Sequence, residues 1–280
     1  MLLIFGGTTE GRKAVEVLDE SGSLYYYSTK TGEQSISLQH GIRIDGPLDT
    51  HAMAQFCRDH HIRLIVDAAH PFARQLHQNI AQVAGELSIP VIRYERIYPP
   101  RDPDFTWIDD YSQIPSNVHS LLATTGVQSI AKLKPLEDRG VRLWYRILPR
   151  QSSIDQARAQ GASDHQLLFY HDHDDPIPTG LPAEAILLKE SGLTGGFLGK
   201  VRAAQAQGMR VIVLKRPPLT SLMFNAQCSM FNQRHRVGGD AFLTAGETEL
   251  LCCRSLDRDI VPVGLHHLRQ AILHRLDVRI

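Results

Sequence analysis

An excess of charge of either sign is absent from this sequence. Among its 280 residues, lysine and arginine number 30 and aspartate and glutamate also number 30, so the formal net charge is zero. This balance argues against general electrostatic capture of nucleic acid or of an anionic membrane, although a local basic pocket stays compatible with it. We therefore expect no nucleic-acid partner.

Long apolar runs and cysteine pairs are also lacking. No apolar run approaches the roughly 20 residues that a membrane-spanning helix requires, so we expect no membrane association. The four cysteines form no CxxC pair, which argues against a disulfide framework or a structural zinc site. The segment Met1–Gly6 is typical of a strand and a turn, not of a basic leader. We expect a cytoplasmic protein.

The sequence does contain a regular alternation of short apolar runs and amphipathic stretches. This pattern is typical of parallel βαβ units and predicts an α/β fold with two Rossmann-like parallel-sheet domains in tandem and a ligand cleft between them. Strands are predicted at residues 1–5, 24–27, 64–66, 91–93, 121–123, 141–147, 167–170, 185–188 and 211–214. Helices are predicted at residues 50–60, 71–87, 154–160 and 197–207, and directly after the first glycine turn.

A proline-rich joint, Tyr98–Pro103, separates the two series of strands. We predict a first Rossmann-like domain at 1–115, a second at 116–218, and an extension at 219–280 that packs on the second domain. Within the extension, the sequence favours a short hairpin near Gly246 and a terminal helix over Gly264–Leu276.

The first candidate site is the turn between the first strand and the first helix, GGTTEGR. A strand that ends in glycines before a helix exposes free backbone N–H groups, which bind phosphate or carboxylate. The spacing is not GxGxxG, so a plain tight turn is the alternative. The candidate ligand-binding residues are Gly6, Gly7, Thr8, Thr9 and Arg12.

The end of the second strand indicates which dinucleotide would bind. NAD-binding folds place a carboxylate here for the ribose hydroxyls, whereas this sequence has Ser28, Thr29 and Lys30. Hydroxyls and a lysine suit a 2′-phosphate, so NADPH is predicted as the cofactor in preference to NADH. A solvated loop is the alternative.

A third candidate follows the strand at 64–66. Asp67 and His70 lie at the predicted carboxyl edge of the sheet, and Pro71 suits the first turn of the next helix. Projecting into a crevice, they could act in catalysis, one as an acceptor and one as a proton donor. Alternatively, both side chains only hydrogen-bond the turn.

The second half repeats the strand, glycine loop and helix arrangement twice. Several such loops in one chain suggest a highly anionic ligand, so we expect their residues to bind the substrate or the cofactor. They are Thr125, Gly126, Lys189, Ser191, Gly192, Gly195, Gly196 and Lys200.

The run His171–Asp175 has residue types that ligate metals, but two prolines follow within three residues, which favours a solvated loop. No metal is predicted.

Taken together, GGTTEGR, VDAAHPFARQLHQNIAQVAGELSIPVIRYER, LLATTG and LLKESGLTGGFLGKVRAAQAQGMRVIVLKRPP resemble the ordered signatures of precorrin-6A reductases. The resemblance runs from Met1 to about Pro218. It departs from the family at Ala69, where threonine is usual, at Gly11, where alanine is common, and in the longer KESGLTGG loop.

This resemblance implies NADPH-dependent reduction of one macrocycle double bond in precorrin-6A, or cobalt-precorrin-6A, to the 6B form. The substrate is a polycarboxylate tetrapyrrole, which fits several loops rich in N–H and cationic donors. The alternatives are another Rossmann-type reductase or epimerase, and a protein that binds NADPH or a tetrapyrrole without turnover.

Overall fold

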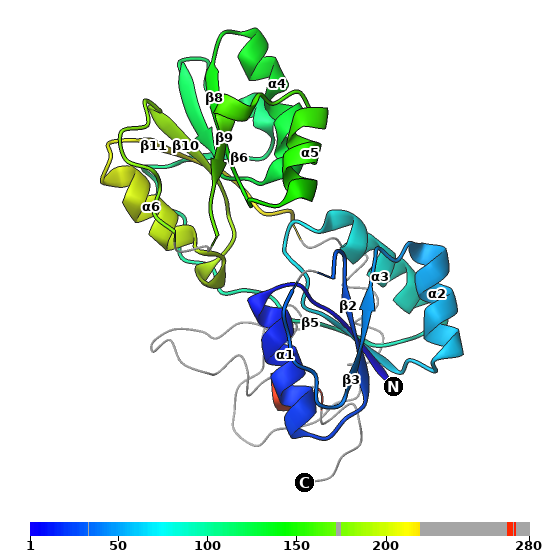
Figure 1. Ribbon diagram of the computed structural model, residues 1–280. Coiled ribbons are helices and arrows are strands. Elements are labelled where there is room, and N and C mark those ends of the chain that lie inside the picture. The colour runs from blue at the N-terminus through cyan, green and yellow to red at the C-terminus, as the bar shows by residue number, and fades with distance from the viewer. Residues whose placement is uncertain (33, 172–174, 219–267, 271, 273–280) are drawn as a thin grey trace, which may run out of the picture. The chain divides into compact units, whose positions relative to one another are not determined.

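The computed structural model describes residues 1–32, 34–171, 175–218, 268–270 and 272, and these divide into two compact units (Figure 1). The first unit is Met1–Ile97 together with the segment from Pro217 onward, and the second is Tyr98–Arg216.

The first unit is a three-layer α/β sandwich around a parallel sheet in the order β3-β2-β1-β4-β5. Helix α1 covers one face and helices α2 and α3 cover the other. The bounds are β1 Leu2–Phe5, α1 Thr9–Glu20, β2 Tyr25–Thr29, β3 Gly41–Asp45, α2 Thr50–Asp59, β4 Leu64–Asp67, α3 Arg74–Leu87 and β5 Val91–Arg93.

Strand β1 shows why the central strands form continuous apolar runs. Leu2 and Ile4 lie in the cluster that includes α1, whereas Leu3 and Phe5 lie in the cluster that includes α2 and α3. A strand buried on both faces needs apolar side chains at successive positions, as parallel sheets require.

The second unit has a parallel sheet in the order β6-β11-β10-β7-β8-β9, with α6 packed on one face through Phe197 and Val201. The main elements are β6 Thr106–Ile108, β7 Ser120–Ala123, α4 Ile130–Asp138, β8 Arg142–Ile147, α5 Gln151–Ala159, β9 Leu167–Phe169, β10 Ala185–Lys189, α6 Phe197–Gln205 and β11 Arg210–Leu214. Short 3₁₀ turns lie at Tyr111–Gln113, Val127–Ser129, Asp164–Gln166 and Leu193–Gly195.

The predicted fold class, two Rossmann-like parallel-sheet domains, is confirmed. The first unit ends at Ile97 rather than near residue 115, because β6 pairs with β11 of the second sheet. Of the extension, Leu268 and Ile272 are buried in the core cluster of the first unit, not the second. The predicted hairpin lies outside the described residues.

No helix within the described part of the chain is long and apolar enough to span a bilayer.

Candidate functional site at the carboxyl edges of the two sheets

The glycine turn after β1 closes over the ring of Tyr27. A Cβ on Gly6 would lie 2.2 Å from the Tyr27 hydroxyl, and one on Gly11 would lie 2.8 Å from the Gly6 Cα. The Gly7 N–H donates to the same hydroxyl at 3.0 Å. Two of the three glycines therefore serve close packing, and Gly7, with a positive φ of 83° and open space at its Cβ, leaves the turn accessible.

We expect Gly11→Ala to lower the free energy of unfolding by about 1–3 kcal/mol, because the added methyl overlaps the Gly6 backbone and the Tyr27 hydroxyl. Gly85→Ala is the matched control, since its Cβ would meet nothing within 4 Å. Gly85 lies in the last turn of α3, and replacing a helical glycine by alanine should stabilise by up to about 0.5–1 kcal/mol. Urea unfolding of both variants measures the difference, and equal shifts would contradict the packing argument.

Thr8 joins two of the predicted loops. Its hydroxyl accepts the Gly11 N–H at 3.0 Å as the N-cap of α1, and donates to the Ala68 carbonyl at 2.7 Å. Strands β1 and β4 are neighbours whose connections leave in opposite directions, so this edge is the topological switch point where open α/β sheets bind ligands. The structure thus brings Gly6–Thr9 and Ala68–His70 together.

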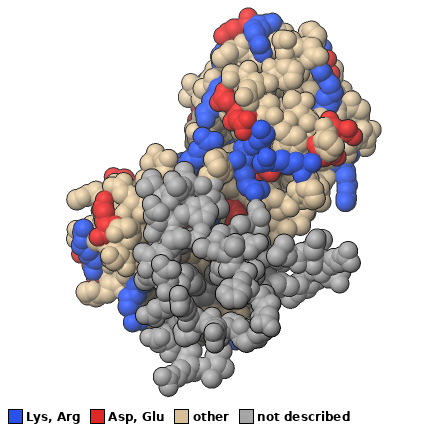
Figure 2. Space-filling model, turned by 180° about the vertical axis from the view of Figure 1, so that it is seen from behind, with Lys and Arg blue, Asp and Glu red and all other residues tan. Residues whose placement is uncertain are grey.

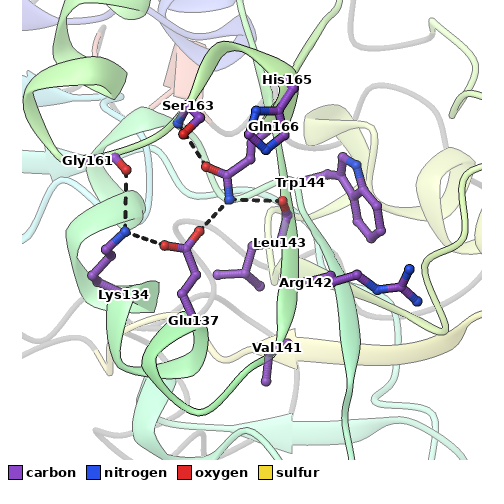
Figure 3. Close-up of a pocket in the computed structure, with 10 residues that line it drawn as sticks. All are labelled: Lys134, Glu137, Val141, Arg142, Leu143, Trp144, Gly161, Ser163, His165 and Gln166. Carbon is purple, nitrogen blue, oxygen red and sulfur yellow. Dashed lines mark hydrogen bonds and ion pairs between the residues drawn. The ribbon is translucent and has the colours of Figure 1, made fainter.

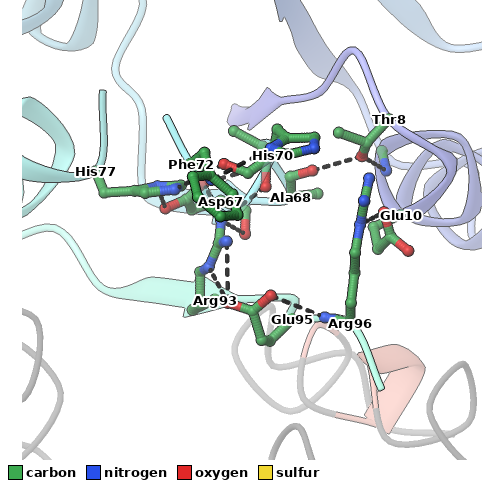
Figure 4. A network of polar contacts seen from close by, with 12 residues as sticks. Thr8, Glu10, Asp67, Ala68, His70, Phe72, His77, Arg93, Glu95 and Arg96 are labelled. Carbon is green, nitrogen blue, oxygen red and sulfur yellow. Dashed lines mark hydrogen bonds and ion pairs between the residues drawn. The ribbon is translucent and has the colours of Figure 1, made fainter. Parts of the chain in front are cut away.

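Asp67 is fully buried, which corrects the expectation that it projects into a crevice. Arg93 Nη1 donates to one carboxylate oxygen at 2.7 Å, and His77 Nδ1 lies 2.8 Å from the other (Figure 4). Burial acts to raise the pKa of Asp67, but Arg93, His77 and the Ala69 N–H hold it below its ordinary value. Its role here is to organise the loop rather than to contact a ligand.

His77 was missed by the sequence analysis, yet it ties Asp67 to His70. Its Nε2 lies 3.0 Å from the His70 carbonyl while its Nδ1 lies against Asp67. Both partners are acceptors, so the ring satisfies both only with a proton on each nitrogen. The regular α-helical spacing of the buried side chains in α3 offered no signal that one of them was a hydrogen-bonding residue.

The side chain of His70 is partly exposed and its Nδ1 accepts the Phe72 N–H at 3.2 Å. The proton of the neutral ring must therefore be on Nε2. Nearby, Arg93 also bonds Glu95, and buried Arg96 pairs with buried Glu10 at 2.9 Å, so α1 is linked to the segment after β5 (Figure 4).

The end of β2 differs from the sequence expectation. Ser28 and Thr29 are buried, and the Thr29 hydroxyl donates at 2.7 Å to Asp45, which arrives from the neighbouring strand β3. Arg43 pairs with the same carboxylate at 3.0 Å. Lys30 is exposed, as are Thr9 and Arg12. A carboxylate therefore does lie at this edge, neutralised by an arginine, and the sequence analysis missed it because β3 was not predicted.

Arg12 lines a cavity of about 500 Å³ between α1 and the segment Ser35–Gln39. This places its side chain beside the segment that follows β2.

In the second unit the predicted loops follow β7 and β10, which are adjacent strands at that sheet's switch point. The Thr125 hydroxyl bonds Ser129 at 2.6 Å, and Gly126 has a positive φ of 85°. Helix α6 begins at Phe197, and its N-cap residue Gly196 provides no side-chain cap. In the loop after β10, Ser191 donates to the Gly195 carbonyl at 3.1 Å, and Gly192 has a positive φ of 73°.

Lys189 ends β10 and is largely enclosed. Burial, followed by repulsion from Lys132, lowers the pKa of Lys189 to about 8. Lys200 lies on α6, one turn after the loop, and is partly exposed. Together these residues place hydrogen-bond donors and positive charge at the second switch point.

A different cavity of about 340 Å³ lies at the amino end of β8, away from the switch point (Figure 3). Glu137 is its central acid and receives hydrogen bonds from Gln166, Lys134 and Tyr145. These groups hold one another, so the cavity offers a structural polar network. Among the described residues no cluster of three or more potential metal ligands occurs, and residues 172–174 of the histidine–aspartate run lie outside them.

Comparison with known proteins decides the family. The model of the precorrin-6x reductase CbiJ/CobK family matches residues 1–235. The chain belongs to this family. The match extends past Pro218, where the resemblance expected from sequence ended.

Relatives of this family cover most of the chain. The cobalt-precorrin-6A reductase of Priestia megaterium is 29% identical over 78% of this chain and 91% of its own length. The precorrin-6A reductase of Rhodococcus erythropolis is 28% identical over 78% of this chain and 90% of its own. The solved structure of CobK precorrin-6A reductase superposes with a TM-score of 0.61 at 17% identity, over 78% of this chain and 89% of that one, which shows the same fold.

Proposed function

We propose that this chain reduces one double bond of precorrin-6A, or of cobalt-precorrin-6A, with NADPH as hydride donor to give the corresponding 6B macrocycle. The observation that carries the proposal is the family match over 1–235, joined to two switch-point loop clusters that carry the predicted donors. An oxidoreductase of corrin biosynthesis needs both a dinucleotide and a polycarboxylate receptor.

The first switch point fits a dinucleotide. Gly7 leaves its backbone open to close approach, and Thr9, Arg12 and Lys30 provide exposed donors for phosphate oxygens. NADPH supplies the hydride when bound. His70, beside this turn, presents an Nε2–H donor that would hold an acceptor atom of the ligand, and the Asp67–Arg93–His77 cluster keeps the loop that carries it in place.

The second switch point is proposed to bind acidic groups of the ligands through Thr125, Gly126, Lys189 and the loop Ser191–Gly196, with Lys200 adding positive charge. Carboxylate arms and phosphates both prefer such cationic, N–H-rich surroundings.

The charge of Lys189 gives a pH prediction. With a pKa of about 8, the amine is a cation below that pH and neutral above it. We expect the affinity for uroporphyrin III, a fluorescent octacarboxylate tetrapyrrole, to fall about threefold to tenfold between about pH 7 and about pH 9. Lys189→Met should remove this dependence, and Lys132→Met should move its midpoint upward. A midpoint that Lys132→Met leaves in place would contradict the assignment.

Cofactor choice is predicted to depend on Lys30. Lys30→Asp places a carboxylate where a 2′-phosphate would approach, so NADPH affinity should fall about tenfold or more while NADH affinity changes little. Fluorescence titration of both dinucleotides measures the ratio. The partly exposed Lys13, one residue after Arg12, provides a control through Lys13→Asp. Equal losses for NADPH and NADH would contradict the role of Lys30.

The proposal as a whole is tested by NADPH oxidation with anaerobic precorrin-6A and, separately, with its cobalt form, monitored at the nicotinamide band and by mass of the product. A gain of two hydrogens in one of them is the expected result. Tight NADPH binding without reduction of either macrocycle would favour the other Rossmann-type activity, or binding without turnover.

A further inference from the structure

Glu190, at the end of β10, gathers two arginines from distant parts of the second unit. Its side chain is 5% exposed, and Arg101 donates to both carboxylate oxygens, through Nε at 3.1 Å and Nη2 at 3.0 Å. The Arg216 N–H donates to the same carboxylate at 2.9 Å, and Arg216 Nη1 lies 3.5 Å from it. Glu190 thus pairs with Arg101, which lies 89 residues earlier in the chain, and with Arg216, which lies 26 residues later.

An aromatic ring also lies against each of the two guanidinium groups. Arg216 lies 3.6 Å from the centroid of the Tyr98 ring, and Arg101 lies 5.4 Å from that of Trp107. Stacking and ion pairing together restrict the rotamers of two long side chains, so little conformational entropy is left to lose when they bind a further group.

Arg101 and Arg216 have N–H donors that Glu190 does not engage. Arg101 is 48% exposed and Arg216 is 28% exposed, whereas the acid that holds them is almost fully buried. Two guanidinium charges face the Glu190 carboxylate, with Asp109 close enough to act on Arg101 as well. Lys189 at the end of β10 and Lys132 of α4, which acts on Lys189, add further positive charge. In the view of Figure 2, Lys and Arg side chains lie over this unit with Asp and Glu side chains among them. A surplus positive charge on rigid, partly exposed forks is suited to an oxyanion.

We propose that Arg101 and Arg216, held by Glu190, form an oxyanion fork that binds one acidic group of the enzyme's ligands. The acidic group is a carboxylate arm of the macrocycle or a phosphate of the cofactor, each of which offers a pair of anionic oxygens that the planar guanidinium can bind in a bidentate way. The assignment rests on the proposed function for the identity of these ligands. None of the three residues was among the sites predicted from sequence.

Binding measurements on the full chain test the fork without requiring turnover. Arg101→Gln and Arg216→Gln are titrated with uroporphyrin III, with its uncharged octamethyl ester, and with NADPH. Arg158→Gln is the matched control, because Arg158 makes the same two-point contact with Asp164 at 2.8 and 2.9 Å but stacks on no aromatic ring of the described residues. We expect about tenfold weaker binding of one acidic ligand for both fork variants, no effect with the ester, and no effect of Arg158→Gln.

The variant Glu190→Gln distinguishes two effects of Glu190 on anion binding: it holds the two arginines in place, and it adds a negative charge. Removing a negative charge would by itself strengthen binding of an anion, whereas loosening the two arginines weakens it; we expect weaker binding, by about threefold to tenfold. Loss confined to uroporphyrin III identifies a carboxylate arm, and loss confined to NADPH identifies a phosphate. Unchanged affinity for both ligands in folded Arg101→Gln and Arg216→Gln, or tighter binding by Glu190→Gln, overturns the fork even if reductase activity is confirmed.

Discussion

Asp67→Asn is expected to lower the free energy of unfolding by about 3–5 kcal/mol, the largest effect on stability predicted for this chain. Arg93 and His77 would keep their donors inside the protein but lose the carboxylate that neutralises them. An amide can accept from one of them only by turning its own NH₂ toward the other, which leaves a repulsive contact. Urea unfolding at neutral pH measures the loss.

The effect depends on pH in a defined direction. Asp67 has a pKa below its ordinary value in the folded state, so its contribution is complete above the unfolded pKa of about 3.9 and is lost as the pH falls through the lower folded value. The wild type and Asp67→Asn should therefore differ most near neutral pH and converge in strong acid. Asp59→Asn, an exposed acid on α2, should stay within about 0.5 kcal/mol of wild type. A similar small change for Asp67→Asn would mean that the buried cluster contributes no stability.

His70→Ala is expected to lower kcat by about 100-fold or more, the largest effect predicted on turnover. The Phe72 N–H occupies Nδ1, so we expect the ring to act as a neutral donor through Nε2. Protonation of Nδ1 would break that bond, so the protonated ring is not expected to be the active form.

Two further variants separate the nitrogens of His70. Glutamine places its amide N–H near the position of Nε2 and should retain activity within about tenfold, whereas asparagine reproduces only the Nδ1 side and should resemble alanine. Steady-state kinetics at saturating NADPH make the comparison, with melting temperatures as the check on folding. If His70→Ala keeps turnover within a few-fold of wild type, His70 is structural and the reaction centre lies elsewhere.

The architecture could be predicted because the central strands are buried on both faces and therefore consist of continuous apolar runs. Strand β3 was missed since its side chains are mostly half-buried or exposed, and α4 was missed because Pro135 interrupts its pattern. Strand β6 follows directly on the proline-rich joint and was assigned to no element. Each missed element lies where the local residues give little sign of what they pack against.

The location of the candidate site followed from topology, but the role of its residues did not. Parallel strands bring their carboxyl ends to one edge, so the loops after β1 and β4 had to meet there. Asp67 has the residue type of a catalytic acid, yet its partners His77 and Arg93 lie 10 and 26 residues further along the chain. No spacing rule joins these positions, and burial is visible only in three dimensions.

The packing of Tyr27 beneath the glycine turn constrains how this protein can evolve. A Cβ at Gly6 would overlap the Tyr27 ring and hydroxyl, and a Cβ at Gly11 would lie 2.9 Å from that hydroxyl and 2.8 Å from the Gly6 Cα. Replacing Tyr27 with a smaller residue would therefore relieve only part of the strain of an alanine at position 11, and the Gly6 backbone would still have to shift. The same replacement would remove the hydroxyl that accepts the Gly7 N–H, and another acceptor, such as Gln34, would have to take over its position under the turn. Changes at positions 6, 11 and 27 are therefore expected to occur together rather than independently.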